Sequence, residues 1–284
     1  MNDAAKEKLT MERDLPRALA RSEFTLRYQP QLDIRSGSVV GVEALLRWIH
    51  PEFGLVKPAQ FIPAAEQSGL IEAIGEWVLS TACVQACIWQ GSGLPEMTIA
   101  VNLSVRQCLN PRLYDMVARV LSDTGIDPQR LELEITESVA MNSAEAAVAN
   151  IRDLKAMGIR LSIDDFGTGY SALSQLKCCP VSKLKIDQSF VRNLGFDATD
   201  AAIVRAIIFL GHSLEMAVIA EGVETDRQLA LLTAYGCDEI QGYLLAPPAA
   251  AGDTPELIRR LRIYPIAVRK PSEKRNGLPT AVPL

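Results

Sequence analysis

Short apolar runs that suit β-strands alternate along this chain with longer segments of helical periodicity. The first two runs, residues 24–34 and 39–45, are rich in aliphatic and β-branched residues, and only residues 35–38 join them. A connection this short cannot hold a crossover, so the two strands are predicted to be antiparallel. The chain therefore opens with a predicted hairpin.

After the hairpin the two kinds of segment follow each other regularly. The predicted strands are residues 98–103, 131–136, 159–165, 181–187, 217–221 and 238–243. The predicted helices are residues 71–90, 111–123, 143–157, a short segment after Ser171, 200–213, 226–234 and 254–261. Strands separated by helices of this length predict right-handed crossovers and a parallel sheet. With the hairpin there are eight predicted strands, enough to close an α/β barrel in which one strand runs against the others.

The two ends of the chain lack this alternation. Residues 1–21 are charged, and Pro16 stands where a helix could begin. We interpret this segment as a lead-in helix or linker from an upstream domain and residues 22–262 as the barrel domain. Residues 263–284 contain Pro, Lys, Arg and Gly without periodicity, which predicts a mobile tail.

Composition narrows the classes of function. Hydrophobic residues make up 48% of the 284 residues, and a net charge of -5 gives no electrostatic basis for binding a DNA or RNA polymer. The longest apolar runs, such as 201–210, are broken by charges such as Arg205 and fall short of a membrane span. The six cysteines form no Cys-x-x-Cys pair and the N-terminus has no apolar signal segment. We therefore expect a cytoplasmic protein, or the cytoplasmic portion of a larger one.

The stretch 161–171, Leu-Ser-Ile-Asp-Asp-Phe-Gly-Thr-Gly-Tyr-Ser, ends a predicted strand with two adjacent acids. Neighbouring side chains of a strand point to opposite faces, so Asp164 and Asp165 are not expected to face one core together. Taken alone, two acids followed by Gly167 and Gly169 favour a solvated turn, because Asp and Gly are ordinary turn residues. The ends of the other strands change that interpretation.

Nearly every predicted strand carries a polar residue at the same end. These residues are Glu43, Asn102, Glu134, Asp164, Asp165, Lys185, Asp187, Glu221, Glu224 and Gln241. In a barrel the carboxyl ends of the parallel strands meet at one rim, where active sites lie. Any one of these residues alone would be interpreted as structural, but together they predict a functional site at the rim.

The alternation of charged and aliphatic residues along two strands distinguishes residues expected to take part in catalysis from residues expected to have a structural role. Glu132 and Glu134 share one face of their strand, and Lys183 and Lys185 share one face of theirs, opposite aliphatic residues. The aliphatic faces should pack under the helices, and the charged faces should line the barrel. Glu132 and Lys183 lie deeper and are predicted to form a structural ion pair, whereas Lys185, nearer the rim, is assigned to chemistry.

So many carboxylates at one rim predict bound cations. Two unit charges about 4 Å apart repel by ~4 kcal/mol at an effective dielectric constant near 20, so the acids would otherwise protonate or spread apart. Ligands that are all oxygen select Mg²⁺ or Mn²⁺ over Zn²⁺, and neither His50 nor His212 ends a strand. The number of acids suits two ions about 3.5–4 Å apart, with Asp164 and Asp165 able to serve both.

The same residues carry a family resemblance. They stand in the motifs Glu-Ala-Leu at 43–45 with Arg47 and Trp48, Asn-Leu-Ser at 102–104, Glu-Ile-Thr-Glu at 134–137, Asp-Asp-Phe-Gly-Thr-Gly-Tyr-Ser at 164–171, Lys-Ile-Asp at 185–187, Ala-Glu-Gly-Val-Glu at 220–224 and Gln-Gly-Tyr at 241–243. Over residues 22–262 the chain resembles the EAL-domain family of phosphodiesterases. The resemblance implies a TIM-like (β/α)8 barrel with one antiparallel strand, and hydrolysis of cyclic di-GMP to linear pGpG, which ends a bacterial second-messenger signal.

The resemblance also implies a role for each rim residue. One metal ion would be held by Glu43, Asn102, Glu134 and Asp164. A second would be held by Asp164, Asp165 and Glu221. The catalytic residues would be Glu221 as general base, Lys185 orienting the attacking water, and Glu43. The substrate would be bound by Gln29, Arg47, Asp187, Glu224 and Gln241. Glu137 would support the loop that follows Asp165. The one departure noticed is Ala172, where serine is common in the family.

Two further expectations concern cofactors and partners. The ions would be Mg²⁺ or Mn²⁺, and Ca²⁺ is expected to inhibit because its larger, looser coordination would misplace the attacking water. The resemblance implies a homodimer and an upstream sensor or cyclase domain.

Two alternatives from other functional classes stay open at this point. One is a catalytically silent receptor for cyclic di-GMP, which would lack metal ligands that this chain has. The other is a Schiff-base lyase that uses Lys185, a chemistry that favours a desolvated, uncharged lysine. The many acids near Lys185 would instead keep it charged.

Overall fold

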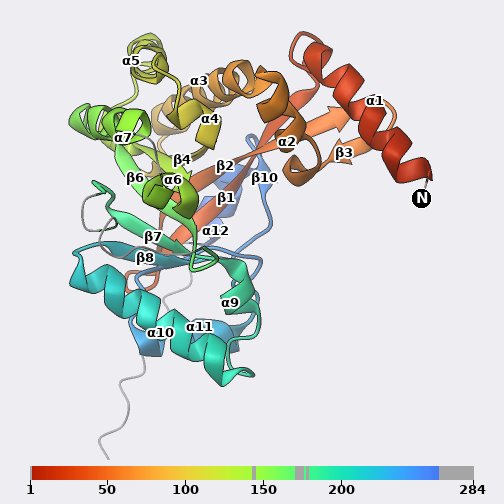
Figure 1. The fold of residues 1–284 in the computed structure, drawn as a ribbon. Helices are drawn as coiled ribbons and strands as arrows, with labels where there is room; N and C mark the ends of the chain where they lie inside the picture. The colour runs from red at the N-terminus through yellow and green to blue at the C-terminus, as the bar shows by residue number, and fades with distance from the viewer. Residues whose placement is uncertain (1, 143–144, 170–175, 177–178, 262–284) are drawn as a thin grey trace, which may run out of the picture.

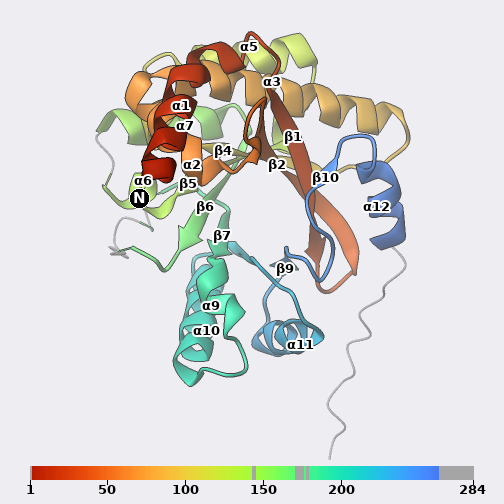
Figure 2. The same ribbon diagram turned by 90° about the vertical axis from the view of Figure 1, so that its right-hand side faces the viewer.

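The computed structural model describes residues 2–142, 145–169, 176 and 179–261. Eight strands form a closed ring. These are β1 (Phe24–Asp33), β2 (Ser38–His50), β4 (Thr98–Leu103), β5 (Leu131–Thr136), β6 (Arg160–Phe166), β7 (Lys183–Ile186), β8 (Ala217–Ala220) and β9 (Glu239–Ile240). The sheet order is β10-β1-β9-β8-β7-β6-β5-β4-β2-β3, and pairing of β1 with β2 closes the ring, which Figure 2 views nearly end-on. The predicted barrel is confirmed.

The opening hairpin supplies the one strand that runs against the rest. β1 pairs antiparallel with β2 and with β9, whereas the pairs from β2 through β4 to β9 are parallel. The second strand was predicted to end at residue 45 but continues to His50, where the chain turns back into the short strand β3 (Gly54–Val56). The expectation that His50 does not end a strand is therefore wrong. Neither β3 nor the two-residue strand β10 (Ala249–Ala250) was predicted from the sequence.

Helices cover the outside of the barrel. The predicted helices correspond to α3 (Leu70–Gly91), α5 (Leu113–Thr124), α7 (Glu145–Ala156), α10 (Ala198–Ser213), α11 (Asp226–Tyr235) and α12 (Thr254–Leu261). Helices α3, α5 and α7 lie together on one side of the ring and α10 and α11 on the other (Figures 1 and 2). The unpredicted helices are α2 (Pro58–Ser68), α4 (Val105–Cys108), α6 (Glu137–Asn142), α9 (Gln188–Arg192) and the 3₁₀ turn Pro128–Arg130. Most of the helix expected after Ser171, together with Ala172 and the predicted tail, lies outside the described residues.

The N-terminal segment is one helix, α1 (Asn2–Ala18), and the predicted helix start at Pro16 is wrong. Pro16 lies inside the helix near its C-terminal end, where the missing N–H costs one backbone hydrogen bond. The described side chains Met11, Leu15 and Ala18 are buried in the hydrophobic core. The boundary of the lead-in segment at residue 21 stays a prediction.

Helix α3 is long and apolar enough to cross a membrane, which the sequence-based expectation of short apolar runs overlooked. In this structure α3 packs against α2, α5 and β4 and buries Ile71, Ile74 and Leu79 among other residues. Its polar side carries Glu72, which pairs with Arg106. Its composition is therefore that of a core helix in a barrel.

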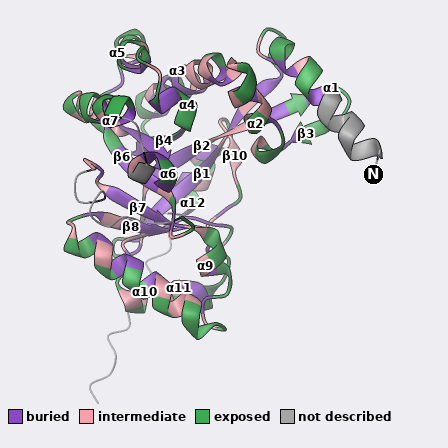
Figure 3. Ribbon diagram, in the orientation of Figure 1, coloured by how far each residue is buried: buried purple, intermediate pink, exposed green. Residues whose placement is uncertain are grey.

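The strand faces follow the predicted alternation. Leu133 and Ile135 are fully buried in the hydrophobic core, while Glu132 and Glu134 occupy the opposite face of β5. Figure 3 shows the buried strands at the centre and exposed residues along the outer helices. The barrel interior is consequently polar, and its charged residues lie where water is excluded.

Candidate functional site

Lys185 stands at the centre of the predicted site and is fully buried. Its Nζ lies 2.6 Å from Glu134 Oε2, 2.7 Å from Glu221 Oε1, 3.1 Å from Asp164 Oδ1 and 3.6 Å from Glu43 Oε2. Lys185 lies on β7, Glu134 on β5 and Glu43 on β2. Asp164 lies near the end of β6, and Glu221 directly follows β8. The barrel thus brings four acids that are far apart in sequence to one ammonium group.

The surrounding charges keep Lys185 protonated. Burial by itself lowers the pKa of Lys185, but the nearby Asp164, Glu134, Glu221 and Glu43 carboxylates outweigh it and hold the pKa well above its usual value. A permanently charged ammonium is a poor Schiff-base nucleophile. The geometry therefore favours an electrostatic role for this lysine over the lyase alternative.

The acids around Lys185 differ in proton affinity. Burial, followed by repulsion from Glu43, raises the pKa of Glu134 well above its usual value. Burial also raises the pKa of Glu221 to about 8, against the attraction of Lys185. For Glu43 burial acts in the same direction, but Lys185 and hydrogen bonds from Gln241 and Asn102 lower its pKa overall. Burial thus favours the protonated forms of Glu134 and Glu221, whereas Glu43 favours its ionised form.

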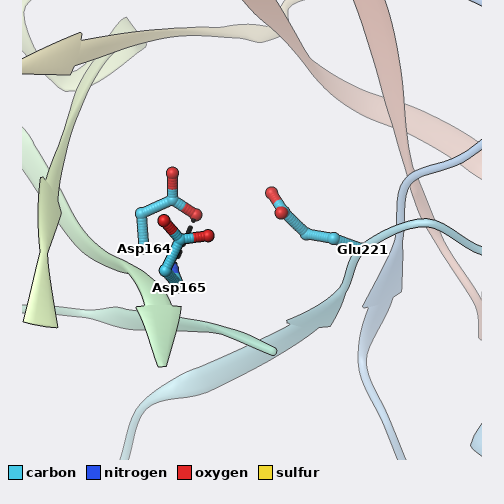
Figure 4. Close-up of side chains that lie close together, drawn as sticks. All are labelled: Asp164, Asp165 and Glu221. Atoms are coloured by element: carbon cyan, nitrogen blue, oxygen red, sulfur yellow. Dashed lines mark hydrogen bonds between the residues drawn. The ribbon is translucent and has the colours of Figure 1, made fainter. Parts of the chain in front are cut away.

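The two adjacent acids share one side of the barrel mouth, contrary to the expectation from strand alternation. The pairing of β6 with β7 is irregular between Ile163 and Phe166, and Asp165 has a φ of 53°. This left-handed residue costs about 1–3 kcal/mol and turns its side chain to the side of Asp164. One carboxylate oxygen from each of Asp164, Asp165 and Glu221 lies within 4.8 Å of the others (Figure 4).

Glu137 binds the loop that follows this irregular strand end. Its side chain is buried, and Oε2 accepts hydrogen bonds from the backbone N–H groups of Gly167 at 2.9 Å and Gly169 at 3.2 Å. Gly167 has a φ of 100°, a conformation that favours glycine. An added Cβ at Gly169 would lie 3.1 Å from Glu137 Oε1, so the glycine permits the close approach.

Amide side chains hold the carboxylate of Glu43. Asn102 Nδ2 donates to Glu43 Oε1 at 2.7 Å, and Gln241 Nε2 donates to Glu43 Oε2 at 2.6 Å. Gln241 Nε2 also donates to Gln29 Oε1 at 3.1 Å. Gln29 and Gln241, which the resemblance places in substrate binding, are therefore both buried in a hydrogen-bond network.

A cavity of about 300 Å³ opens beside these residues at the barrel mouth. Its lining includes Gln29, Arg47, Glu221, Glu224, Tyr243 and Pro248. Tyr243 and Pro248 had no predicted role, although Tyr243 belongs to a motif that the sequence singled out. Asp187 is not among the residues that line this cavity: it caps α9, where Oδ1 accepts from Ser189 N at 3.0 Å. It lies beside Asp165, and burial, the Asp164 charge, and the charge and hydrogen bond of Asp187 together raise the pKa of Asp165 to about 6. A larger cavity of about 400 Å³ lies between α3 and α5, away from the acids at the mouth.

A second charged layer lies deeper in the barrel. Lys183 Nζ is 3.0 Å from Glu132 Oε2, as the strand alternation predicted, and 2.9 Å from Glu239 Oε2. Glu239 had no predicted role, although it lies in the predicted strand 238–243, where alternation with Gln241 would have placed it inside the barrel. This layer sets one ammonium group between two carboxylates and forms no ion pair with the acids around Lys185 among the described residues, which is consistent with a structural role.

The acids at the mouth fit a divalent cation. Four carboxylates lie within 3.6 Å of one ammonium group, and a fifth, Asp165, lies beside Asp164 and Glu221. Glu134 Oε1 is buried without a hydrogen-bond partner. The available donors are carboxylate and amide oxygens, which suit hard ions such as Mg²⁺ and Mn²⁺. The residues Glu43, Asn102, Glu134, Asp164, Asp165 and Glu221 could therefore hold such ions.

A sequence profile of the EAL domain matches residues 12–248. The chain therefore belongs to the EAL-domain family of cyclic di-GMP phosphodiesterases, enzymes whose hydrolysis depends on metal ions. It is 49% identical over 251 residues to the bifunctional diguanylate cyclase/cyclic di-GMP phosphodiesterase MucR of Pseudomonas aeruginosa, covering 88% of this chain and 37% of that protein. It is 40% identical over 255 residues to the oxygen sensor protein DosP of Escherichia coli, covering 90% of this chain and 32% of that protein.

Solved structures of EAL domains also resemble this chain. The P. aeruginosa MucR phosphodiesterase in complex with c-di-GMP superimposes with a TM-score of 0.83 at 48% identity, covering 86% of this chain and 99% of that one. The EAL enzyme Bd1971 with bound cAMP and cyclic di-GMP also gives a TM-score of 0.83 at 32% identity, covering 89% of this chain and 69% of that one. The chain spans about a third of the length of the curated relatives it matches.

Proposed function

We propose that this chain binds cyclic di-GMP at the barrel mouth and hydrolyses it to linear pGpG with two Mg²⁺ or Mn²⁺ ions. The observation that carries the proposal is the convergence of four carboxylates on the buried Lys185 Nζ. A binding module alone has no need to hold so many buried acids together against their repulsion. The solved structure of the MucR phosphodiesterase in complex with c-di-GMP supports the choice of substrate.

We assign the acids to two metal positions that share Asp164. One ion would be bound by Glu43, Asn102, Glu134 and Asp164. The other would be bound by Asp164, Asp165 and Glu221. Bound there, the ions would neutralise the phosphodiester and activate the attacking water. The ligand atoms of Asp164, Asp165 and Glu221 already lie close enough together to share a cation, which supports the second position.

Lys185 and Glu221 would manage the proton of the attacking water. Lys185 Nζ donates toward Glu221 Oε1, which leaves the other oxygen of Glu221 to accept that proton. Burial raises the pKa of Glu221 to about 8, which makes its carboxylate a stronger base than an exposed one. The charged Lys185 would orient the water and stabilise the negative charge that develops on the phosphate.

The cavity at the mouth would receive the rest of the dinucleotide. Arg47 is half-buried in the cavity wall and provides a positive charge for the phosphate backbone. Glu224 would contact guanine from the same wall. Asp187 would shape the pocket from the start of α9. Gln29 and Gln241 reach the wall from the network around Glu43.

The lengths of the relatives support a wider proposal. We propose that the chain acts as the phosphodiesterase unit of a larger signalling protein that carries a sensor or cyclase domain. The unit would act in the cytoplasm as a homodimer and lower the concentration of a bacterial second messenger.

Incubation of the purified chain with cyclic di-GMP and Mg²⁺ or Mn²⁺ tests the function. We expect pGpG to accumulate and the activity to disappear when EDTA is present. Tight binding of cyclic di-GMP without any pGpG would instead identify a receptor.

A further inference from the structure

Three glutamines lie side by side under the barrel mouth, and one of them has no assigned function. Gln29 and Gln31 are alternate residues of β1, and Gln241 follows β9. Gln31 has no solvent exposure, and Gln29 and Gln241 are only 8% and 4% exposed. Gln31 Nε2 donates to Gln241 Oε1 at 3.0 Å.

The two ends of this network determine the direction of every amide. The Glu43 carboxylate and the Ala246 carbonyl can only accept hydrogen bonds. Gln241 must therefore present Nε2 to Glu43, where the distance to Oε2 is 2.6 Å. Gln29 must likewise present Nε2 to Ala246 O, at 3.1 Å, which leaves its oxygen facing Gln241 Nε2.

With both N–H groups of Gln241 engaged, its oxygen needs a donor, and Gln31 supplies one. Without that donor, the buried oxygen of Gln241 would lose its hydrogen-bond partner, which is unfavourable for a buried polar atom. Because the same amide group donates to Glu43, the hydrogen bond from Gln31 helps to hold Gln241 in the position from which it supports Glu43.

The surroundings of Gln31 indicate that the amide is kept for this contact and not for packing. Its Oε1 is buried without a hydrogen-bond partner, which destabilises the fold relative to an apolar side chain. Gly41, its register partner on β2, makes room: an added Cβ there would lie 2.8 Å from Gln31 Oε1.

We propose that Gln31 is a positioning residue for the hydrolysis proposed above, on which this inference rests. It acts through Gln241 to fix the Glu43 carboxylate that would hold the first metal ion. Gln241, by the same geometry, belongs to the support of Glu43 as well as to the cavity wall.

The test is Mn²⁺ binding to the full chain, measured by calorimetry without substrate, alongside turnover of cyclic di-GMP. Gln31→Leu should weaken Mn²⁺ binding by ~10- to 100-fold, the usual effect of losing a residue that orients a metal ligand. At saturating Mn²⁺ the KM for cyclic di-GMP should stay near the wild-type value while kcat falls. Gln31→Met, which keeps a similar volume but offers no donor, should lose as much. Wild-type Mn²⁺ affinity in either variant would overturn the proposal.

Asn150 provides a matched control for the loss of a buried amide. It is 9% exposed, lies in α7, and donates to the backbone carbonyls of Cys108 and Asn110 outside the barrel. Asn150→Leu should lower thermal stability at least as much as Gln31→Leu but leave Mn²⁺ affinity and kcat unchanged. Equal losses of Mn²⁺ affinity in both variants would show that Gln31 acts only through general stability.

A double-mutant cycle separates action through Gln241 from an independent effect. If Gln31 acts through Gln241, adding Gln31→Leu to Gln241→Leu should weaken Mn²⁺ binding by less than twofold further. If the losses of Mn²⁺ affinity caused by the two substitutions multiply in the double variant, the proposed action of Gln31 through Gln241 is overturned. A wild-type chain that makes no pGpG would refute the phosphodiesterase proposal, whereas the Mn²⁺ affinities would still decide the role of Gln31.

Discussion

At the scale of single residues, Lys185 supplies the positive charge that partly offsets the acids at the barrel mouth. One fully buried ammonium group lies within 3.6 Å of four carboxylates and compensates only part of their charge. Burial raises the pKa values of Glu134 and Glu221, which favours their protonated forms and so reduces the remaining negative charge. Divalent cations that bind at the mouth would displace these protons, so protons and metal ions should compete.

Replacing Glu134 with glutamine tests the metal assignment with little change of shape. We expect Glu134→Gln to reduce kcat by roughly 100-fold or more, because the first metal ion would lose a carboxylate ligand that the surrounding hydrogen-bonded residues cannot replace. The metal-free protein should be no less stable, because burial already favours the neutral form of Glu134. Rates of pGpG formation and thermal melts measure the two effects.

Glu72→Gln is the control for this substitution. Glu72 is 44% exposed and pairs with Arg106 on the helical layer, so its loss should leave kcat unchanged. A near-normal rate in Glu134→Gln would refute the first metal position.

The raised pKa of Glu221 predicts a pH dependence of metal binding. Glu221 has a folded pKa of about 8, above the usual 4.5, so ionising it destabilises the metal-free protein as pH rises from about 4.5 through about 8. Mn²⁺ needs the ionised carboxylate, so its stabilising effect should grow over the same window. The rise in Tm caused by Mn²⁺ should be larger at pH 8.5 than at pH 6.5.

Glu221→Gln should reduce this pH dependence, because the glutamine does not titrate. A Tm increment that is constant between the two pH values in the wild-type protein would contradict the assignment.

Strand alternation was sufficient to predict the most buried site residues from the sequence. It placed Glu134 and Lys185 inside the barrel and paired Glu132 with Lys183, as the structure shows. The same rule was wrong at Asp165, because a left-handed backbone conformation there depends on the irregular pairing of β6 with β7. No local pattern in the sequence reports such a register shift.

At the scale of elements, two loops at the barrel mouth are tied together by their backbones. Val223 N donates to Gln241 O at 3.1 Å, and Leu244 N donates to Val223 O at 2.9 Å. Between these contacts Gly242 passes so close to Val223 that no side chain fits. This crossing joins the loop that carries Glu221 to the residue that holds Glu43.

Gly242→Ala should therefore disrupt the mouth. Its Cβ would stand 2.2 to 2.7 Å from three backbone atoms of Val223, which cannot be relieved by a rotamer change. We expect destabilisation of at least the ~1–3 kcal/mol typical of overpacking, measured by denaturant unfolding. Gly252→Ala, where an added Cβ meets no atom within 4 Å, is the control and should be nearly neutral. Equal stability of the two variants would contradict the crossing.

This crossing also explains where the predicted elements differ from the observed ones. The last barrel strand was expected over 238–243, but only Glu239–Ile240 pair in β9, because the following residues leave the sheet to meet Val223. Helix α2 was missed because Pro58 and Pro63 suggest a loop, whereas Pro58 occupies the first turn, where its missing N–H costs nothing. Long-range contacts, absent from local periodicity, decide both cases.

At the scale of the whole molecule, the number of strands and their alternation with helices were enough to predict the barrel. In this barrel the eight strands form a closed ring in which β1 runs antiparallel to its neighbours. The short connection after β1 predicted that antiparallel pairing from the sequence. The size of the relatives was not predictable from the chain. Its similarity covers 37% of MucR and 32% of DosP, so the chain spans about a third of the length of these two relatives.

The mouth of this barrel is acidic and its proposed substrate is an anion, so substrate binding should need divalent cations. Ca²⁺ provides the sharpest test, because it offers the same charge with ligand distances of about 2.3–2.6 Å in place of about 2.0–2.1 Å for Mg²⁺. We expect Ca²⁺ to support binding of cyclic di-GMP, measured by calorimetry, but to lower turnover by roughly 100-fold, because reaction needs the attacking water closely aligned.

Added to the Mg²⁺ enzyme, Ca²⁺ should inhibit, and excess Mg²⁺ should restore the rate. Turnover with Ca²⁺ as fast as with Mg²⁺ would mean that charge neutralisation alone suffices and that the geometry of Glu43, Asp164 and their neighbours is not what limits hydrolysis. Substrate binding that is equally tight in EDTA would contradict the more basic premise, because Lys185 and Arg47 alone would then outweigh five carboxylates.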